Sequence, residues 1–261
     1  MVDEAFLGAE PRLVQGVLSD TKWAVVDNFL SEDTIRTLRK EAVALRKEGC
    51  FQTSQSERNG IVYEKNNVEA MQLDSDEQYF IAPRLHEYVV QTARSLPGLL
   101  NNGEVDVDGS YAANKLAVCL GGGSSYDKHF DNGGGGDTRK LTALLYLNAD
   151  WTPEMGGEFR LWADDGTGSG TEECVDVEPK GGRLLVFFAD SLPHAVMPSQ
   201  LVDAAVGGCN DGDGDNAGHR YALTVWLPAA GGVADISFDP EKEDMHWGVG
   251  RTAVTAATRR I

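Results

Sequence analysis

Cysteine is scarce in this chain, and its few occurrences lie far apart. Four of the 261 residues are cysteine, at positions 50, 119, 174 and 209, and no two of them form a C-x-x-C pair. This spacing gives no zinc-finger or thiol–disulfide motif and no disulfide framework. We therefore expect reduced thiols and a cytoplasmic or nuclear protein.

Long apolar runs are also missing. No stretch reaches the length of about 18 apolar residues that crosses a membrane. The N-terminus, Met1-Val2-Asp3-Glu4, is acidic and lacks the basic and apolar regions of a signal peptide. We expect no membrane partner.

Positive charge is in deficit. The chain has 23 Lys and Arg against 41 Asp and Glu, which gives a formal net charge of −18. Such an excess of negative charge opposes binding to nucleic acid or anionic membranes through the whole surface. It is compatible with a basic protein partner or simply with high solubility, and we expect a monomer that binds no nucleic acid.

The first hundred residues predict helical support around a sheet. Residues 1–20 show little pattern, and 23–30 are typical of a strand that runs into a turn. Apolar residues at helical spacing predict one amphipathic helix over 31–49 and another over 76–96, which the following Pro-Gly pair would end. The polar residues 52–60 have no periodicity and predict a loop.

From residue 115 the pattern changes to short strands separated by Gly-rich turns, in a chain with 30 glycines. The long apolar run 141–148 is expected to be buried on both faces. This pattern indicates a mainly β protein with two flanking helices (α+β), closed or built from two sheets. We expect a single domain over 1–261, with helical support at 21–100, a core at 111–228 and a C-terminal tail at 229–261.

One short motif carries metal chemistry. His129 and Asp131 are two residues apart, so on a strand their side chains would project from the same face. A second imidazole from a distant strand would complete two His and one carboxylate on one side of a metal, which suits a non-haem Fe(II) oxygenase. By itself the His-x-Asp pair is weak evidence.

Seven short stretches in order strengthen this interpretation. Together they resemble the 2-oxoglutarate- and Fe(II)-dependent oxygenases and, among these, the prolyl hydroxylases of the oxygen-sensing type. The resemblance implies a double-stranded β-helix, or jelly roll, for the core. The matching stretches are HFD at 129–131, YLNADW at 146–151, GGEFRL at 156–161, VEP at 177–179, RLLVFF at 183–188, PHAV at 193–196 and RYALTVW at 220–226.

The resemblance assigns the residues of a site. His129, Asp131 and His194 would bind Fe(II). Arg220 would pair with the distal carboxylate of 2-oxoglutarate, for which a planar guanidinium is well suited, and Tyr146 would donate its hydroxyl to the same carboxylate. Arg at this position, in place of Lys, points to the oxygen-sensing branch.

Further residues are implied around these. Thr224 would lie near the cosubstrate, and Trp226 would form a wall of the site. Arg139 matches a position near the substrate cleft, and Leu116 is expected in the surroundings of the site.

The chain also departs from the family pattern. Leu120 stands where the family often has Tyr, so one polar contact to the cosubstrate is expected to be lost. An extra segment at 206–218 separates His194 from Arg220, and we expect a surface loop there, since loop length costs little. Its Asp-Gly repeat at 211–215 lacks the sixth-position Gly and twelfth-position Glu of a calcium loop, and calcium binding is disfavoured.

The implied function is that of a prolyl 4-hydroxylase acting on a proline of an intracellular protein. The reaction would couple hydroxylation to decarboxylation of 2-oxoglutarate to succinate and CO2, using Fe(II) and O2, with ascorbate as a stimulant. The acidic composition suggests basic residues near the target proline. Two alternatives stay open: an oxygenase for a free amino acid or small metabolite, which a flap at 52–60 would argue against, and a non-catalytic jelly-roll module.

Overall fold

The computed structural model describes most of the chain. The described residues are 2–58, 61–103, 105–110, 112–134, 136–164, 172–201, 218–231 and 252–256. The helices are α1 (Val2–Val17), α2 (Glu32–Lys47), α3 (Asp76–Ile81) and α4 (Pro83–Leu100), with a short 3-10 turn at Pro153–Met155. The strands are β1 (Trp23–Val26), β2 (Gln52–Arg58), β3 (Ile61–Met71), β4 (Ala113–Cys119), β5 (Ser124–His129), β6 (Arg139–Tyr146), β7 (Phe159–Asp164), β8 (Glu172–Val177), β9 (Leu184–Phe188), β10 (His194–Ser199), β11 (Arg220–Pro228) and β12 (Thr252–Ala256).

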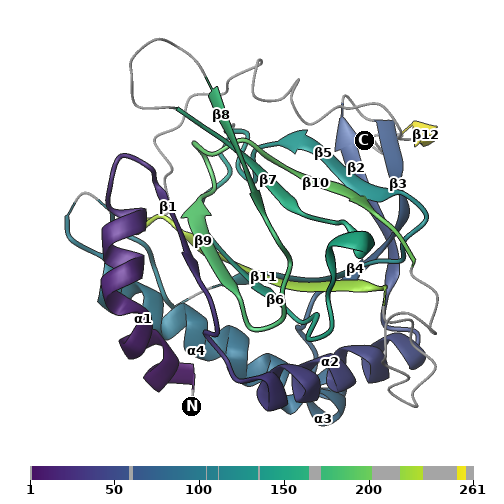
Figure 1. The fold of residues 1–261 in the computed structure, drawn as a ribbon, viewed down its shortest axis with the longest axis horizontal. Helices are drawn as coiled ribbons and strands as arrows, with labels where there is room; N and C mark the ends of the chain where they lie inside the picture. The colour runs from purple at the N-terminus through teal and green to yellow at the C-terminus, as the bar shows by residue number, and fades with distance from the viewer. Residues whose placement is uncertain are drawn as a thin grey trace, which may run out of the picture.

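These strands form two antiparallel sheets. The larger, eight-stranded sheet has the order β1-β9-β6-β11-β4-β3-β12, with β2 paired to β3, and the smaller one has the order β5-β10-β7-β8. The helices lie along one face of the larger sheet, and the smaller sheet covers the other face (Figure 1). The architecture agrees with the predicted jelly-roll core, although the described residues form four α-helices where two were expected.

Alternation along the central strands divides the core into two layers. On β6, Leu141 and Leu145 point into the cluster shared with the helices, whereas Leu144 and Tyr146 point into the cluster between the sheets. Successive strand residues face opposite sides, so a strand covered on both sides is apolar at nearly every position. The expectation that 141–148 is buried on both faces is confirmed.

A buried polar network joins α2 to the turn after β6. Arg39 donates to the Asn148 side-chain oxygen at 3.1 Å and to the His219 carbonyl at 3.0 Å. Asn148 also accepts from the Tyr221 backbone N–H at 2.8 Å and donates to the Pro179 carbonyl at 2.9 Å. One amide side chain thus satisfies polar groups from three segments that are distant in sequence.

The N-terminal residues, expected to have little pattern, instead form α1. Phe6, Leu13 and Val17 are buried on one side of this helix, which packs against α4 and β1. Pro11 lies inside the helix. Proline removes a backbone donor and disfavours helix interiors, so its presence argued against a helix at the level of the sequence. The helix forms because its apolar side packs against the rest of the protein.

The predicted loop at 52–60 is also wrong for the described part of that range. Residues 52–58 form β2, which pairs antiparallel with β3, so this region is a hairpin. Its residues are mostly polar, and backbone pairing stabilises it without the apolar alternation that reveals a half-buried strand.

The boundaries of two other regions differ from the prediction. The second expected helix is divided at Ala82 into α3 and α4, and α4 continues through Pro97 to Leu100. The expected C-terminal tail contains a strand, β12, which pairs with β3. The insert at 206–218, with its Asp-Gly repeat, lies outside the described residues except for Gly218.

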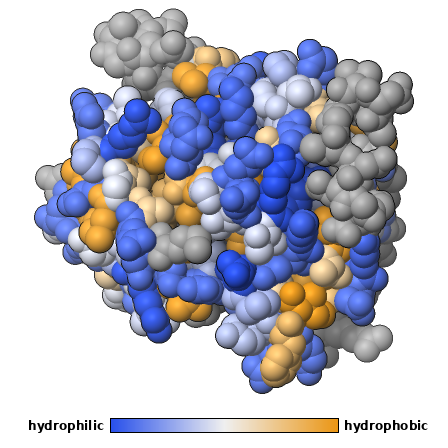
Figure 2. Space-filling view, turned by 60° about the horizontal axis from the view of Figure 1, so that its bottom comes forward, coloured by the Kyte–Doolittle hydropathy of each residue, from blue (hydrophilic) through white to orange (hydrophobic). Residues whose placement is uncertain are grey.

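The helical side of the molecule is largely hydrophilic, with small apolar patches (Figure 2). The large apolar side chains that are exposed on the helices are Leu7, Tyr79, Phe80 and Val90. Within the described part of the chain, no helix has the length and apolarity needed to span a membrane.

Replacing Asn148 tests the buried network. Asn148→Ala leaves the Tyr221 N–H and the Pro179 carbonyl without their partners, so we expect the free energy of unfolding to fall by about 2 kcal/mol or more. Urea denaturation measures this change. Asn66→Ala, at an exposed position, is the control and should stay within about 0.5 kcal/mol of the parent; equal effects of the two substitutions would contradict the assigned role of the network.

Candidate active site

Strand pairing brings the two predicted imidazoles together. His129 ends β5 and His194 begins β10, and the two residues are direct partners in the antiparallel register. The Nδ1 of His129 lies 2.7 Å from the Asp127 carbonyl, and the Nδ1 of His194 lies 3.0 Å from the Leu192 carbonyl. A carbonyl acceptor fixes the proton on Nδ1, so Nε2 is the ring nitrogen that can bind a metal.

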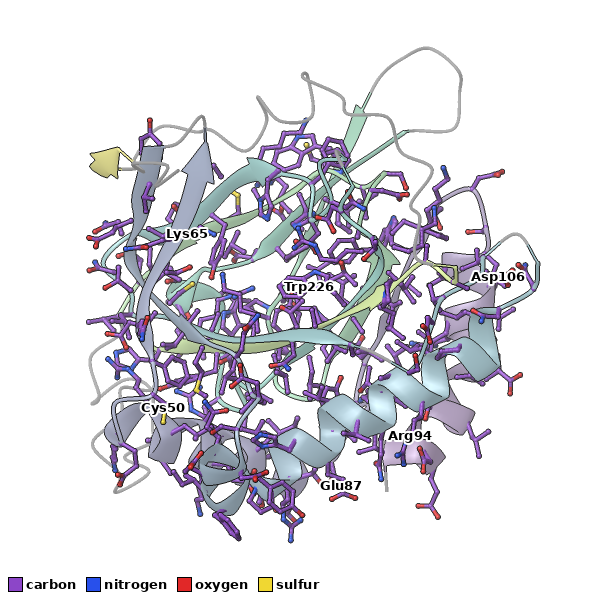
Figure 3. The ribbon with its side chains drawn as sticks, turned by 180° about the vertical axis from the view of Figure 1, so that it is seen from behind. Cys50, Lys65, Glu87, Arg94, Asp106 and Trp226 are labelled. Carbon is purple, nitrogen blue, oxygen red and sulfur yellow. The ribbon has the colours of Figure 1, made fainter. Side chains whose placement is uncertain are left out.

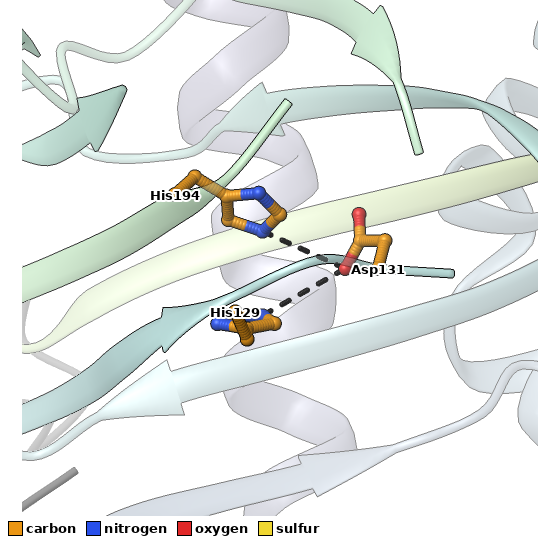
Figure 4. Close-up of side chains that lie close together, drawn as sticks. All are labelled: His129, Asp131 and His194. Carbon is orange, nitrogen blue, oxygen red and sulfur yellow. Dashed lines mark ion pairs between the residues drawn. The ribbon is translucent and has the colours of Figure 1, made fainter. Parts of the chain in front are cut away.

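Asp131 completes the group (Figure 4). Its Oδ1 lies 3.8 Å from the His129 Nε2 and 3.6 Å from the His194 Nε2. Its Oδ2 accepts from the Thr142 hydroxyl at 2.7 Å and from the Trp226 indole N–H at 3.0 Å. One carboxylate oxygen is therefore fixed by the larger sheet, and the other faces the imidazoles.

The electrostatics favour the metal-binding protonation states. Burial, followed by the charge of His194, lowers the pKa of His129 well below its ordinary value. For Asp131, burial acts to raise the pKa, but the neighbouring histidines and the hydrogen bond from Thr142 outweigh it and hold the pKa well below the usual range. A neutral imidazole and an ionised carboxylate are the forms that ligate metals.

Aromatic rings fix the orientation of His194. Phe159 stacks on this imidazole with ring centroids 4.7 Å apart and an interplanar angle of 17°. Phe187 meets it edge-on at 4.9 Å. With only 3% of its surface exposed, His194 is held in one orientation by packing as well as by its hydrogen bond.

The three side chains line a cavity of about 340 Å³ between the two sheets. Arg220 and Tyr146 form its buried end, with the guanidinium carbon 5.2 Å from the Tyr146 ring centroid. The Nη2 of Arg220 and the hydroxyl of Tyr146 have no hydrogen-bond partner among the described residues. Burial raises the pKa of Tyr146 to about 12, although Arg220 opposes the shift, so the hydroxyl remains a donor.

These two unpaired donors fit an anionic ligand. A buried donor without an acceptor is costly, and a carboxylate between the guanidinium and the phenol would satisfy both. The distal carboxylate of 2-oxoglutarate has this chemistry. The set of His129, Asp131 and His194, whose ligand atoms lie within 4.8 Å of one another, likewise fits Fe(II).

Gly157 explains why a Gly-Gly pair precedes β7. Its carbonyl accepts from the Arg220 Nε at 2.7 Å. It has φ +76°, and a Cβ there would lie 2.7 Å from the Arg220 Cδ. Glycine is thus required both for the backbone conformation and for the approach of the arginine.

The remaining predicted residues divide into two groups. Thr224, Trp226 and Arg139 all line the cavity, and Arg139 is paired with Asp137 at 2.9 Å. Leu116 does not line it and lies in the core on the helical side of the sheet.

Leu120 likewise packs against the core cluster on the helical side. It therefore offers the cavity nothing in place of the tyrosine that the family often has.

Several cavity residues were missed from the sequence. Thr142 and Phe159 support the ligand residues, and Gln55, Lys65 and Lys115 line the wall formed by β2, β3 and β4. Seen from behind, Lys65 lies on the β2–β3 hairpin and Trp226 lies toward the centre of the molecule (Figure 3). Successive residues of a strand face opposite sides, so Lys115 points into the cavity and Leu116 points into the core beneath the helices. The sequence alone did not show which of the two faces the cavity.

Comparison with known proteins agrees with this geometry. Residues 115–228 match the family described as the 2OG-Fe(II) oxygenase superfamily, a segment that contains all three predicted ligand residues and Arg220. This part of the chain is a 2OG-Fe(II) oxygenase domain. The resemblance read from the seven short stretches is confirmed.

Relatives of the domain include proteins named as prolyl hydroxylases. Human Egl nine homolog 1 is 30% identical over 213 residues, which covers 77% of this chain and 42% of that protein. The hypoxia-inducible factor prolyl hydroxylase of Caenorhabditis elegans is 28% identical over 221 residues, covering 80% of this chain and 27% of that protein. The chain thus spans less than half the length of these two curated relatives.

Solved structures share the fold. A Trichoplax adhaerens prolyl hydroxylase, solved with a hypoxia-inducible factor peptide, superposes with a TM-score of 0.66 at 22% identity and covers 88% of this chain and 93% of its own. A Pseudomonas putida prolyl-4-hydroxylase gives 0.63 at 23% identity and covers 85% and 99%. At this identity the likeness supports the jelly-roll fold.

Thr142→Val tests the support of Asp131. The substitution keeps the shape of the side chain but removes the hydroxyl that donates to Oδ2, so we expect Fe(II) affinity to fall about 10- to 100-fold. Anaerobic competition with a chromogenic chelator measures it. Thr92→Val, at a buried position in α4, is the matched control and should keep the parent affinity; an unchanged affinity in Thr142→Val would refute the role of the hydroxyl.

Gly157→Ala tests whether the close contact with Gly157 positions Arg220. The added Cβ would displace Arg220, so we expect the Kd for 2-oxoglutarate to rise about 10-fold or more, as for loss of a charged hydrogen bond. Gly103→Ala is the control, because Gly103 also has a positive φ (+90°) but open space around it. Titration calorimetry should find normal 2-oxoglutarate affinity in the control. Normal affinity in both variants would contradict the role of Gly157 in positioning Arg220.

Proposed function

We propose that this chain is a 2-oxoglutarate- and Fe(II)-dependent dioxygenase that hydroxylates C4 of a prolyl residue in a polypeptide. The observation that carries the proposal is the convergence, in one cavity, of three metal-ligating side chains and two buried donors without partners. A metal alone would not need the buried Arg220. A charged cosubstrate next to the metal accounts for both.

Each residue has a defined part in this proposal. The Nε2 atoms of His129 and His194 and the Oδ1 of Asp131 would hold the iron, while Thr142 and Trp226 keep Asp131 turned toward it. Three protein ligands leave room for the cosubstrate and O2 on an octahedral metal.

The arginine and the tyrosine hold the cosubstrate. Arg220 and Tyr146 would bind its distal carboxylate and orient it toward the metal. When bound, Fe(II), 2-oxoglutarate and O2 supply the oxidising chemistry, which yields succinate, CO2 and the hydroxylated product, and ascorbate would keep the iron reduced.

The polypeptide substrate is supported by the relatives. Two relatives in sequence are named Egl nine homolog 1 and hypoxia-inducible factor prolyl hydroxylase. The free amino acid or metabolite alternative has no comparable support. The unpaired cysteines Cys50, Cys119 and Cys174 are consistent with action in a reducing compartment.

The β2–β3 hairpin stands where a loop was expected, and this changes the argument about the substrate. The distinction between a mobile flap and a closed site does not apply, because 52–58 is a paired strand that contributes Gln55 to the cavity wall. A hairpin beside the opening offers backbone and side chains along which an extended polypeptide can lie.

Incubation with proline peptides tests the proposal. With Fe(II), ascorbate, O2 and 2-oxoglutarate, we expect a mass increase of about 16 Da on proline, from insertion of one oxygen atom, and one succinate for each hydroxyl formed. Amino-acid analysis should identify 4-hydroxyproline. Asp131→Ala should abolish both products, because it removes a metal ligand. Succinate formation that is uncoupled from every peptide but coupled to a free amino acid would contradict the assignment.

A further inference from the structure

Lys115 makes a hydrogen bond that passes over one strand of the larger sheet. It lies on β4, and its ammonium donates to the Ser54 hydroxyl of β2 at 3.2 Å. β3 lies between these two strands, because it pairs with β4 on one side and with β2 on the other. The side chain of Lys115 lines the cavity, so it reaches across the cavity side of β3 and ties β2 directly to β4.

Ser54 stands where the pairing of the β2–β3 hairpin is interrupted. On one side of it Thr53 pairs with Glu69. On the other side Gln55 pairs with Glu64, so Ser54 alone faces four residues of β3. Such a bulge disrupts the ladder of backbone hydrogen bonds and bends the strand. Beyond it β3 gains β12 as a second neighbour, whereas the described residues give β2 no strand partner other than β3.

The burial pattern agrees with an inward contact at this point. Ser54 is only 4% exposed, whereas its neighbours Thr53 and Gln55 are exposed. Lys115 is partly buried, and an ammonium that has lost water needs an acceptor. The Ser54 hydroxyl provides it, and the Tyr126 ring adds a second contact with its centroid 5.4 Å from Nζ. A charge-assisted hydrogen bond thus holds the hairpin where its own pairing is weakest.

The part of the hairpin held in this way borders the cavity. Gln55 and Lys65 come from the two strands of the hairpin at the interruption, and both line the cavity wall (Figure 3 shows Lys65). Because Gln55 is also exposed, it lies at the opening. The proposed cosubstrate residues Arg220 and Tyr146 form the buried end. Displacement of the hairpin would therefore change the wall at the opening and leave the buried end in place.

We propose that the Lys115–Ser54 hydrogen bond fixes the β2–β3 hairpin at the cavity opening and so positions one wall of the polypeptide-binding site. This inference rests on the proposed function and makes Lys115 and Ser54 positioning residues for the polypeptide. An extended segment binds along a pre-organised hairpin at a lower ordering cost than along a moving one. Loss of the hydrogen bond weakens polypeptide binding and spares 2-oxoglutarate binding.

Hydrogen exchange tests the hydrogen bond without any substrate. In Ser54→Ala and in Lys115→Met we expect the amides of 52–58 to exchange about 10-fold faster, as for loss of a hydrogen bond to a charged group. The double variant should exchange no faster than either single variant, because both substitutions break the same bond. Parent rates in both single variants, or independent effects that multiply to about 100-fold in the double variant, would overturn the proposal.

Lys180→Met is the matched control for the loss of a lysine. The Nζ of Lys180 also lies near an aromatic ring, 6.0 Å from the Trp151 centroid, but Lys180 is outside this cavity. The amides of 52–58 should keep their parent exchange rates in this variant. Equal acceleration in Lys180→Met and Lys115→Met would overturn the specific role of the Lys115–Ser54 hydrogen bond.

Steady-state kinetics with a proline peptide tests the positioning role. Ser54→Ala should raise the peptide KM about 10-fold and keep kcat and the Kd for 2-oxoglutarate within about 2-fold of the parent, since only binding of the polypeptide is weakened. This variant leaves β4 unaltered, so the measurement does not depend on the folding of Lys115→Met. A parent-like peptide KM despite faster exchange would overturn the positioning role. Faster, non-additive exchange in a protein that hydroxylates no proline peptide would support the hydrogen bond and refute the proposed function.

Discussion

The hydrogen bonds from the larger sheet to Asp131 connect the two halves of this molecule at the point where its chemistry would occur. His129 and His194 belong to adjacent strands of the smaller sheet, so their register alone places them side by side. Asp131 follows β5, but its outer oxygen is held by Thr142 of β6 and Trp226 of β11. The ligand geometry thus depends on how the two sheets pack.

That packing in turn depends on the alternation along the central strands. One set of side chains on β6, β9 and β11 fills the layer beneath the helices, and the other set fills the space between the sheets. The second set is apolar near β7 and β8 and becomes polar at the cavity, where Thr142, Thr224 and Arg220 replace aliphatic residues. The alternation of side chains along these strands therefore both fills the core and places the polar residues of the cavity.

Much of this arrangement could be predicted from the sequence, for identifiable reasons. The predicted metal ligands and Arg220 lie in short stretches that are weak singly but resemble one family when taken in order. The apolar run 141–148 is too long and continuous for a half-exposed strand. What could not be predicted depends on pairing and parity. β2 is polar and becomes a strand only through its partner β3. Lys115 faces the cavity, and Leu116 the core, because of a register that no local pattern reveals.

The central claim is that one ferrous ion and one 2-oxoglutarate bind together in this cavity. Anaerobic titration of the protein with Fe(II) in the presence of 2-oxoglutarate tests it directly, because chelation of the metal by the keto acid produces a visible metal-to-ligand charge-transfer band. The structure predicts a band that saturates at one iron per chain. Iron binding without such a band, with 2-oxoglutarate in excess, would contradict the account.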